Sequence, residues 1–308
     1  MLLWLLTPTR SDSAAMFRIL VFLLKAIARL PLGVLYVFAD FIFFLLYFVI
    51  RYRRKLVRKN LSSAFPDKSP KDLRLIERRF YRNFADYVVE TIKLLHISDA
   101  EIEKRMHFEG LDLVRDLLDN KKSIVAYFSH CGNWEWAPSI TLHCPAQLAA
   151  GDAFCQIYRP LKNRNFDRLM LHIRSRFGSQ SIPKKNTLRH LLAFRRDNIT
   201  SITGFMSDQK PSHGDTVHIV DFLNRPTAVI TGTEQLARRL DMAVVYWDMS
   251  KPSRGHYLIT VRLITDHIAD TAPMQVTDSY FRLLESTIRR DPAIWLWTHN
   301  RWKNSPQA

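Results

Sequence analysis

The chain has 308 residues, of which 47% are hydrophobic and 24% are charged, and its formal net charge is +16. This length and composition fit one large α/β domain with an appendage, and they allow a full hydrophobic core. The positive charge indicates an anionic partner: nucleic acid, an anionic membrane surface or an acidic protein. Cys131, Cys144 and Cys155 lack C-x-x-C spacing, and the histidines form no H-E-x-x-H pattern. We therefore expect neither a disulfide framework nor a metal site.

The amino-terminal segment contains two predicted helices. Residues 1–15 fit poorly with the helical pattern of the neighbouring residues, and we interpret them as an upstream or non-native extension. Residues 17–30 predict an amphipathic helix whose basic residues share one face. Residues 32–50 form an apolar run with Asp40 as the only charge. This run is just long enough to cross a hydrocarbon core of ~30 Å.

A dense basic cluster follows the apolar run directly. It consists of Arg51, Arg53, Arg54, Lys55, Arg58 and Lys59. Such a cluster beside an apolar helix is typical of the cytoplasmic side of a membrane, and it also suits anionic headgroups. Residues 16–60 are therefore predicted to anchor the chain, with the remainder in the cytoplasm. A shallow, tilted or re-entrant insertion stays open because a charge at the bilayer centre is costly, and so does a buried helix of a soluble protein.

The remaining chain divides into a helical region, 61–105, an α/β domain, 106–303, and a tail, 304–308. Ser69 and Pro70 mark the start of a long helix. Hydrophobic patterns predict strands at 106–109, 123–128, 147–150, 156–160, 199–206, 217–223, 242–248 and 257–264. They predict helices at 111–118, 134–142, 163–177, 188–196, 233–240 and 276–290. The alternation indicates an α/β fold with a mixed central sheet flanked by helices.

The stretch 123–136, S-I-V-A-Y-F-S-H-C-G-N-W-E-W, contains the predicted site. Its beginning is apolar and rich in β-branched and aromatic residues, which predicts a buried strand that delivers His130 to its carboxyl end. Ligands and catalytic groups in open α/β sheets gather at this edge. A turn at Gly132 and Asn133 would allow Glu135 to approach His130.

The pair of His130 and Glu135 suggests general base catalysis. A carboxylate on one imidazole nitrogen fixes the tautomer, and the other nitrogen can then take a proton from a hydroxyl. No G-x-S-x-G elbow is present, so this hydroxyl would belong to the substrate. A plainer interpretation stays open, in which a core histidine stands beside a glutamate at a helix start. A nucleophile made of Cys131 and His130 is disfavoured, because sequence neighbours rarely aim their side chains at each other.

Polar residues follow two further predicted strands. Arg159 and Lys210 would face the same sheet edge as His130, where Arg159 suits a phosphate or a developing oxyanion. Asp208 can pair with either cation. Arg301, beside an aromatic residue, could bind nucleic acid by stacking and charge. No nucleic-acid module accompanies it, and we expect an anionic glycolipid or a carrier-protein surface instead.

Five short motifs resemble the bacterial late acyltransferases of lipid A biosynthesis, the lauroyl and myristoyl transferases. They are Arg58-Lys59-Asn60-Leu61 with Phe65-Pro66, His130-Cys131-Gly132-Asn133-Trp134-Glu135, Tyr158-Arg159-Pro160, Asp208-Gln209-Lys210, and His299-Asn300-Arg301-Trp302-Lys303. They occur in the family's order and span residues 17–303. The H-x-x-x-x-[DE] motif alone is shared with the wider glycerolipid acyltransferases. Cys131 departs from the family, in which a bulky apolar residue is common there.

The resemblance implies a glycerolipid acyltransferase-like fold with an N-terminal membrane helix. It implies transfer of an acyl chain from acyl carrier protein to a hydroxyl of a lipid A precursor, at the cytoplasmic face of the bacterial inner membrane, without a cofactor. His130 and Glu135 map onto the catalytic pair. We assign substrate binding to Gly132, Asn133, Tyr158, Arg159, Asp208, Gln209, Lys210 and Arg301.

Direct transfer is the mechanism we expect. His130 would deprotonate the acceptor hydroxyl and later protonate the departing thiolate, while Arg159 or backbone N–H groups near Gly132 and Asn133 stabilise the oxyanion. An acyltransferase that uses coenzyme A thioesters, or another glycolipid or phospholipid acceptor, is an alternative within the same class. A lipid-binding protein without catalysis and a membrane-attached nucleic-acid binder are alternatives from other classes.

Overall fold

The computed structural model of the chain describes residues 13–212 and 217–303. Most of the predicted extension, 1–12, and the tail, 304–308, lie outside the described residues. Seven strands form one sheet in the order β1-β9-β8-β2-β5-β3-β4, and β6 and β7 form a separate hairpin. The strands are β1 Met106–Glu109, β2 Ile124–Phe128, β3 Ala153–Tyr158, β4 Gln180–Pro183, β5 Ser201–Met206, β6 Val217–Asp221, β7 Pro226–Ile230, β8 Ala243–Ser253 and β9 His256–Thr265.

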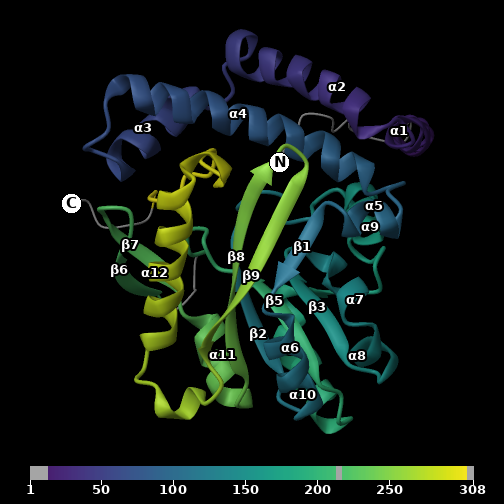
Figure 1. The fold of residues 1–308 in the computed structure, drawn as a ribbon, viewed down its shortest axis with the longest axis vertical. Coiled ribbons are helices and arrows are strands. Elements are labelled where there is room, and N and C mark those ends of the chain that lie inside the picture. The colour runs from purple at the N-terminus through teal and green to yellow at the C-terminus, as the bar shows by residue number, and fades with distance from the viewer. Residues whose placement is uncertain (1–12, 213–216, 304–308) are drawn as a thin grey trace.

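The main sheet is mixed. β8, β2, β5, β3 and β4 run in one direction, while β9 is antiparallel to β8 and β1 pairs parallel with β9. β2 is the central strand and is buried throughout, as its apolar run predicts. Helices cover the sheet (Figure 1), with α12 against β8 and β9 and α6 against β2 and β9. The predicted α/β fold with a flanked, mixed central sheet is confirmed.

Most of the helices lie where the periodic segments of the sequence predict them. They are α1 Ser13–Ala28, α2 Leu32–Phe44, α3 Arg54–Ala64, α4 Pro70–Lys93, α5 Asp99–Glu103, α6 Leu111–Asp119, α7 Ile140–His143, α8 Pro145–Ala149, α9 Arg164–Arg174, α10 Thr187–Arg196, α11 Gly232–Leu240 and α12 Gln275–Arg290. Short 3₁₀ segments occur at Ala137–Ser139, Lys184–Asn186, Ile268–Asp270 and Pro292–Ile294. Ser69 caps α4 by accepting a hydrogen bond from the Asp72 N–H at 3.2 Å, as the Ser69-Pro70 signal predicts.

Two predictions of elements are wrong. The predicted strand 147–150 lies in α8 and its cap, because Pro145 stands in the first turn of this helix, where proline favours a helix. Residues 134–142 form a turn, a 3₁₀ segment and the short α7 in place of one helix, since Pro138 has no N–H to donate. The strand predicted at 217–223 is confirmed as β6, which pairs with β7 outside the main sheet.

The apolar run 32–50 is helical without a break from Leu32 to Val49, because α2 continues into a π-helical turn, η2 Leu45–Val49. Among the described residues it is the one helix long and apolar enough, by length and composition, to cross a membrane. The helix lies along α4 (Figure 1). One face, which includes Leu35 and Ala39, is fully buried.

The basic cluster after α2 is partly engaged within the protein. Glu77 of α4 is 1% exposed and accepts hydrogen bonds from Arg54 Nε and Arg58 Nε, both at 2.8 Å. Arg53 donates to a backbone carbonyl near the C-terminus at 2.9 Å. These arginines fasten α3 to the neighbouring elements, whereas three other members of the cluster are exposed, namely Arg51, Lys55 and Lys59.

We expect Glu77→Gln to lower the free energy of unfolding by about 2–3 kcal/mol, because a neutral amide would then face two guanidinium groups. This is less than the ~3–5 kcal/mol of a fully buried pair, since Arg58 is half exposed. The matched control is Glu101→Gln, which breaks a more exposed pair with Arg105 and should cost less than about 1 kcal/mol. Thermal unfolding in detergent measures both, and equal shifts of the midpoint would contradict this role of Glu77.

Candidate active site

His130 and Asp208 follow two adjacent strands at the same level. In the parallel pair of β2 and β5, Phe128 lies opposite Met206, so each polar residue stands two positions beyond its strand end. His130 Nδ1 is 2.7 Å from Asp208 Oδ1, and the backbone N–H of His130 donates to Oδ2 at 3.0 Å. The strand register therefore builds a histidine–carboxylate pair at the carboxyl edge of the sheet.

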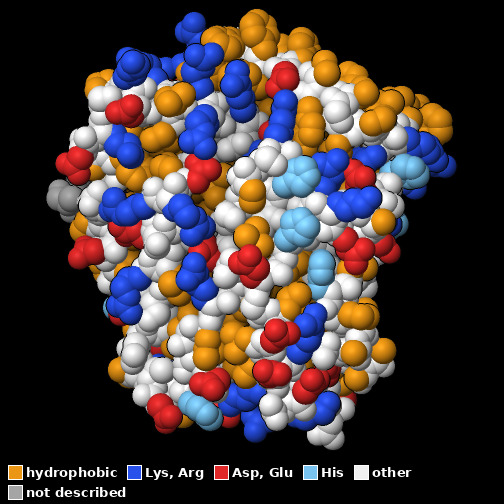
Figure 2. Space-filling view, viewed as in Figure 1, with side chains coloured by type: hydrophobic (Ala, Val, Ile, Leu, Met, Phe, Trp, Pro, Cys, Tyr) orange, Lys and Arg blue, Asp and Glu red, His pale blue; other side chains and the backbone are white. Residues whose placement is uncertain are grey.

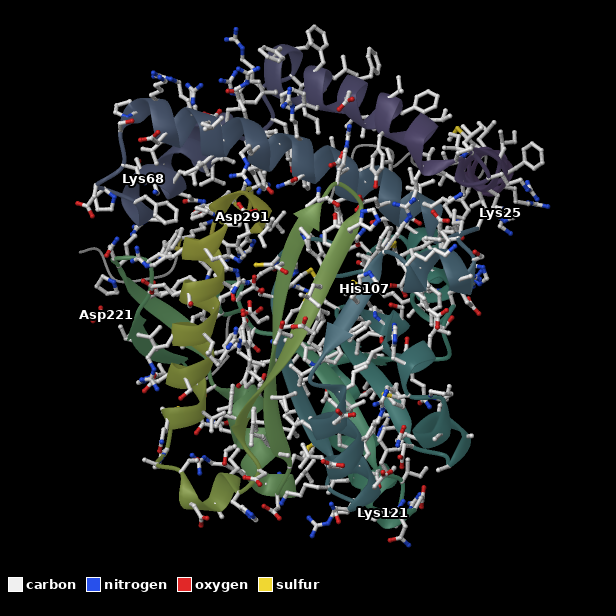
Figure 3. All side chains as sticks on the ribbon, viewed as in Figure 1. Lys25, Lys68, His107, Lys121, Asp221 and Asp291 are labelled. Carbon is white, nitrogen blue, oxygen red and sulfur yellow. The ribbon has the colours of Figure 1, made fainter. Side chains whose placement is uncertain are left out.

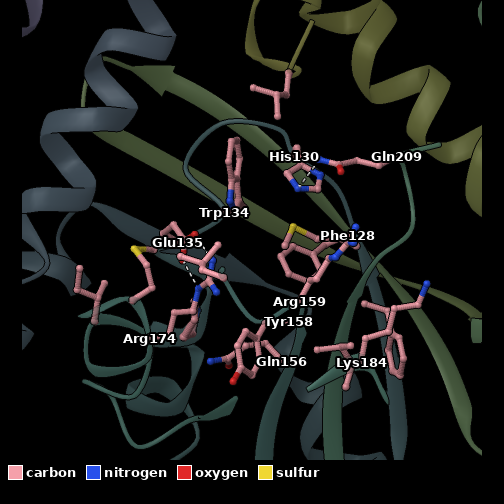
Figure 4. A pocket seen from close by; sticks show the side chains of 18 of the residues that line it. Phe128, His130, Trp134, Glu135, Gln156, Tyr158, Arg159, Arg174, Lys184 and Gln209 are labelled. Atoms are coloured by element: carbon pink, nitrogen blue, oxygen red, sulfur yellow. Dashed lines mark hydrogen bonds and ion pairs between the residues drawn. The ribbon is translucent and has the colours of Figure 1, made fainter. Parts of the chain in front are cut away.

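Asp208 is a buried and ionised carboxylate. It is 2% exposed, and Trp295 Nε1 also donates to its Oδ2 at 2.9 Å. Burial by itself raises the pKa of Asp208, but the charge and hydrogen bonds of His130 outweigh it and lower this pKa to about 2. An ionised Asp208 accepts the Nδ1–H of His130, which leaves Nε2 as the basic nitrogen. Nε2 lies 3.1 Å from Gln209 Nε2 (Figure 4).

The prediction of a hydrogen bond between His130 and Glu135 is wrong, because Asp208 is the carboxylate that binds His130 Nδ1. Glu135 turns to Arg174 of α9, whose Nε and Nη2 bind its two carboxylate oxygens at 2.8 and 2.6 Å (Figure 4). A guanidinium supplies two parallel charge-assisted hydrogen bonds, which an imidazole cannot match. Tyr87 OH is a third neighbour of this carboxylate, at 3.5 Å.

The electrostatics of Glu135 follow from this ion pair. The side chain is 4% exposed. Burial raises the pKa of Glu135, but the charge and hydrogen bonds of Arg174, helped by the charge of His130, bring this pKa below its usual value. A carboxylate that is ionised and engaged at both oxygens is a poor proton acceptor. In this arrangement Glu135 holds Arg174 in the wall of the site.

One large cavity lies beside His130 and Glu135. Its volume is about 1190 Å³, which exceeds the ~300–1,000 Å³ of common small-molecule pockets. Much of its wall is apolar and comes from α1, α4 with the turn after it, and α9. The residues are Leu24, Phe84, Val88, Ile92, Leu95, Leu169, Met170 and Ile173. Such a wall suits a hydrocarbon chain, which gains free energy by leaving water.

The same cavity has a cationic side. It is lined by Arg159, Lys162, Lys184, Lys185 and Lys210, and also by Tyr158 and Gln209. Arg159 and Lys210 therefore share an edge with His130, as their positions after strands predict. Burial, with Asp167 as a second cause, raises the pKa of Tyr158, so its hydroxyl stays protonated. Grouped cations of this kind suit an anionic part of a ligand.

Gly132 and Asn133, which we assigned to substrate binding, instead shape the loop after β2. Gly132 has a φ of +56°, and its N–H donates to Ile294 O at 2.9 Å, so this N–H is not free for an oxyanion. A Cβ at this position would lie 2.6 Å from Met249 Sδ. Asn133 is fully buried and donates to Glu90 Oε2 at 2.8 Å. Neither residue lines the cavity.

Arg301 is also internal, in contrast to its predicted role in substrate binding. It is 1% exposed and donates through Nη1 to Ala228 O at 2.8 Å. Burial lowers the pKa of Arg301 to about 10, against the attraction of Asp208. The C-terminal segment to which it belongs lies against the loop after β2, where the Leu296 N–H donates to His130 O at 3.1 Å. This segment holds the loop that carries His130 in place through hydrogen bonds.

A nucleophilic cysteine finds no support. Cys131 is fully buried, and this burial raises the pKa of its thiol well above the usual value, so a thiolate is disfavoured. Cys144 and Cys155 are buried as well. Across residues 13–212 and 217–303, no three His, Cys, Asp or Glu side chains are grouped so that they could hold a metal ion.

Comparison with known proteins identifies the family. The sequence profile of the bacterial lipid A biosynthesis acyltransferases matches residues 8–304. The chain belongs to this family. It is similar to a lipid A biosynthesis lauroyltransferase of Escherichia coli strain K12, with 23% identity over 260 residues, 83% of this chain and 81% of the relative. Family membership makes the chain an O-acyltransferase.

Two further relatives cover the chain to the same extent. A lipid A biosynthesis acyltransferase of Haemophilus influenzae strain KW20 / Rd is 23% identical over 257 residues, 82% of this chain and 78% of the relative. A lipid A biosynthesis palmitoleoyltransferase of Escherichia coli strain K12 is 22% identical over 259 residues, 83% of this chain and 81% of the relative. The names of these relatives place transfer of fatty acyl groups within the family.

Two residues of this acyltransferase site were missed in the sequence. Arg174 lies on α9, 39 positions from Glu135, and no local pattern connects the two. His299 was noted only as part of the resemblance, yet its Nε2 accepts the Lys210 N–H at 3.3 Å. One signal for Arg174 is present in the sequence: it stands four positions after Met170, so it lies on the apolar face of α9.

His299 gives this acyltransferase an acid-sensitive stability. Burial lowers the pKa of His299 to about 4, although Asp208 opposes the shift, whereas histidine in an unfolded chain titrates near ~6.5. The unfolded state therefore binds the proton first, and folding stability is lost as the pH falls from about 6.5 towards 4, by a few kcal/mol at most. We expect His299→Gln, which keeps an acceptor for Lys210, to flatten this part of the curve of unfolding midpoint against pH. A wild-type curve no steeper than that of the variant would contradict the assignment.

Proposed function

We propose that the chain transfers a fatty acyl group from acyl carrier protein to a hydroxyl of a lipid A precursor, at the cytoplasmic face of the bacterial inner membrane. The observation that carries the proposal is the His130–Asp208 pair, set beside a cavity with an apolar wall and a cationic side. The acyl groups named in the relatives support a fatty acyl donor. The net charge of +16 suits an acidic carrier protein and an anionic acceptor.

The proposed reaction is direct transfer without an acyl-enzyme. His130 Nε2 takes the proton of the acceptor hydroxyl while Asp208 stabilises the imidazolium that forms. The hydroxyl oxygen attacks the thioester carbonyl, and the new C–O bond forms as a tetrahedral oxyanion. When the C–S bond breaks, the thiolate takes the proton back from His130. The acceptor hydroxyl replaces the Gln209 side chain, which is now 3.1 Å from Nε2.

The oxyanion is stabilised by Arg159 in this proposal. Of the donors expected from the sequence, the Gly132 N–H already binds Ile294 O. Arg159 lines the cavity beside His130, and its guanidinium carries several N–H donors that can bind a developing oxyanion. Lys210 and the neighbouring lysines bind the anionic part of the acceptor or of the donor.

Glu135 contributes by fixing Arg174 and by keeping the cavity wall intact. Arg174 is 19% exposed and would be left as a largely buried, unpaired cation if Glu135 were removed. Such a charge is costly, of order several kcal/mol. Glu135 is therefore a positioning residue in the proposal, and Asp208 is the carboxylate that orients the base.

Acyl transfer to a purified lipid A precursor in mixed micelles tests the function. The protein should transfer labelled acyl groups from acyl carrier protein faster than from coenzyme A at equal concentrations, and mass spectrometry of the product should show a new ester. The cationic side of the cavity would also accept the phosphates of coenzyme A, so the reverse preference would select the coenzyme A donor. Absence of transfer from both donors would reject the proposal.

The carboxylate roles predict different signatures for variants. His130→Ala should fall to background. Asp208→Asn should lower kcat on the order of 10²–10⁴-fold in a protein that still folds, because the amide has nearly the same shape but favours the wrong tautomer. Glu135→Gln should lower both activity and the unfolding midpoint, since Arg174 loses its ionic partner.

One result would contradict these roles of Asp208 and Glu135. If Asp208→Asn keeps wild-type kcat while Glu135→Gln loses activity without losing thermal stability, the orienting role belongs to Glu135 and not to Asp208. Initial rates with saturating donor, together with thermal unfolding of the same preparations, distinguish the two results.

Arg159 is predicted to act by position and not through net charge. Arg159→Ala should lower kcat on the order of 10²-fold, the scale of lost oxyanion donors. The matched control is Arg239→Ala, which removes one exposed charge in the last turn of α11 and should change turnover little, because surface charges are screened over ~8–10 Å. Lys210→Ala should raise the KM of the acceptor more than it lowers kcat. Equal turnover of the Arg159 and Arg239 variants would remove Arg159 from the site.

A further inference from the structure

The outer faces of α1 and α2 are apolar and uncovered within the described chain. On α2 the exposed residues recur every three or four positions, which places them in one stripe. They are Val34, Val37, Phe38, Phe41 and Phe44, and Phe48 of η2 continues the stripe; Val37 is 69% and Phe41 60% exposed. On α1 the exposed residues are Met16, Ile19, Phe22, Leu23 and Ile27. Figure 2 shows hydrophobic side chains gathered along this edge of the molecule, and an apolar patch of this extent calls for a partner.

The other face of α2 is bound to charged parts of the protein. Asp40, near the midpoint of the apolar run, accepts a hydrogen bond from Arg254 Nη2 at 2.8 Å, and Arg254 also binds Asp86 at 2.7 Å. Arg254 lies at the turn between β8 and β9. Further along, the Arg82 guanidinium stands 5.2 Å from the ring of Phe43. Charged groups therefore accompany α2 along much of its length.

These contacts conflict with a helix that crosses the bilayer in this fold. If α2 stood along the membrane normal, its midpoint would carry Arg254, Asp86 and the β8–β9 turn into the hydrocarbon. Buried charges and exposed turn backbone are both strongly disfavoured there. With α2 in the plane of the membrane, the apolar stripe enters the leaflet while the pair of Asp40 and Arg254 stays at headgroup depth. An amphipathic helix at the interface has this distribution.

Cations surround the apolar faces. At ~100° per residue, Arg18, Lys25 and Arg29 of the first helix and its end share a strip beside the exposed apolar residues, and all three are exposed. Lys25 points outward at the edge of the molecule (Figure 3). Arg51, Lys55 and Lys59 are exposed after the other end of α2. Positive groups at the level of an apolar surface suit anionic headgroups.

The same helices border the cavity. Leu24 of α1 lines it together with Thr91 and Ile92 of α4, and Phe17 packs edge-on against Phe166 of α9 at 5.2 Å. The wall of the proposed acyl site is thus continuous with the exposed apolar surface. An acyl chain could pass between a leaflet and the cavity along this wall with little exposure to water.

We propose that α1 and α2 lie flat in one leaflet of an anionic membrane and hold the cavity mouth against it, so that α2 does not cross the bilayer. The proposal rests on the membrane association in the proposed function and specifies its geometry. The partner is the lipid surface itself, recognised through an apolar stripe flanked by cations.

Depth measurements on the full-length chain in phosphatidylethanolamine–phosphatidylglycerol vesicles test this geometry. Val34→Cys, Phe41→Cys and Phe48→Cys are each labelled with an environment-sensitive fluorophore, while the native cysteines are buried. The 14 positions from Val34 to Phe48 correspond to roughly 21 Å of helix axis. Phospholipids that carry quenchers at different depths then report the depth of each fluorophore. We expect the same shallow depth at all three sites. Leu192→Cys on α10 is the control and should not be quenched.

Two results would overturn the proposal. In the first, Phe41 is deepest and the other two labels lie near opposite faces, as a spanning helix requires. In the second, none of the three labels is quenched. Acyl transfer in detergent micelles is measured on the same protein, so loss of the docking result and loss of the proposed activity are separable.

A binding measurement gives an independent check. Replacing Phe38 and Phe41 together by serine should weaken vesicle binding on the order of 100-fold, because two aromatic side chains lose their apolar surroundings. Leu192→Ser, which changes an exposed apolar residue on α10, should leave binding unchanged. Wild-type binding by the double variant would reject the docking surface.

Discussion

The parallel pairing of β2 with β5 sets the distance between His130 and Asp208, and the site is assembled around that distance. Because Phe128 lies opposite Met206, the two residues leave the sheet together and meet at 2.7 Å. A slip of one residue would turn every side chain of a strand to the other face of the sheet. Trp295 adds a second restraint, since its indole N–H also binds Asp208. The orientation of His130 thus depends on the pairing of the strands and on the C-terminal segment.

Three buried carboxylates serve this site in three different ways. Asp208 orients His130, Glu135 holds Arg174, and Glu90 fixes the loop through Asn133. Their environments decide these roles. Burial raises the pKa of Glu90, with Lys251 opposing it. Interactions with His130 lower the pKa of Asp208, and the charge and hydrogen bonds of Arg174 lower that of Glu135.

The amino-terminal helix α2 and the loop after β2 are connected through Glu90. Tyr36 of α2 donates to Glu90 Oε1 at 3.0 Å, and the other oxygen of Glu90 binds Asn133 and Tyr257, each at 2.8 Å. The apolar helix and the loop after β2 therefore share one buried carboxylate. A deletion of α2 would remove the Tyr36 hydrogen bond to Glu90 and uncover the face of α4 that carries this carboxylate. The segment proposed to bind the membrane therefore also supports the loop that carries His130.

The sequence by itself determined the features that depend on local pattern. The apolar run of β2, the cap at Ser69 and the position of His130 at a strand end follow from period, β-branching and turn residues close in the chain. The tertiary structure decided which side chains meet. Asp208 is 78 positions from His130 and Arg174 is 39 from Glu135, and no local pattern carries strand order, register or the placement of α9. The sequence therefore indicated a histidine base with a carboxylate partner, but the choice of Asp208 over Glu135 required the long-range pairing of β2 with β5.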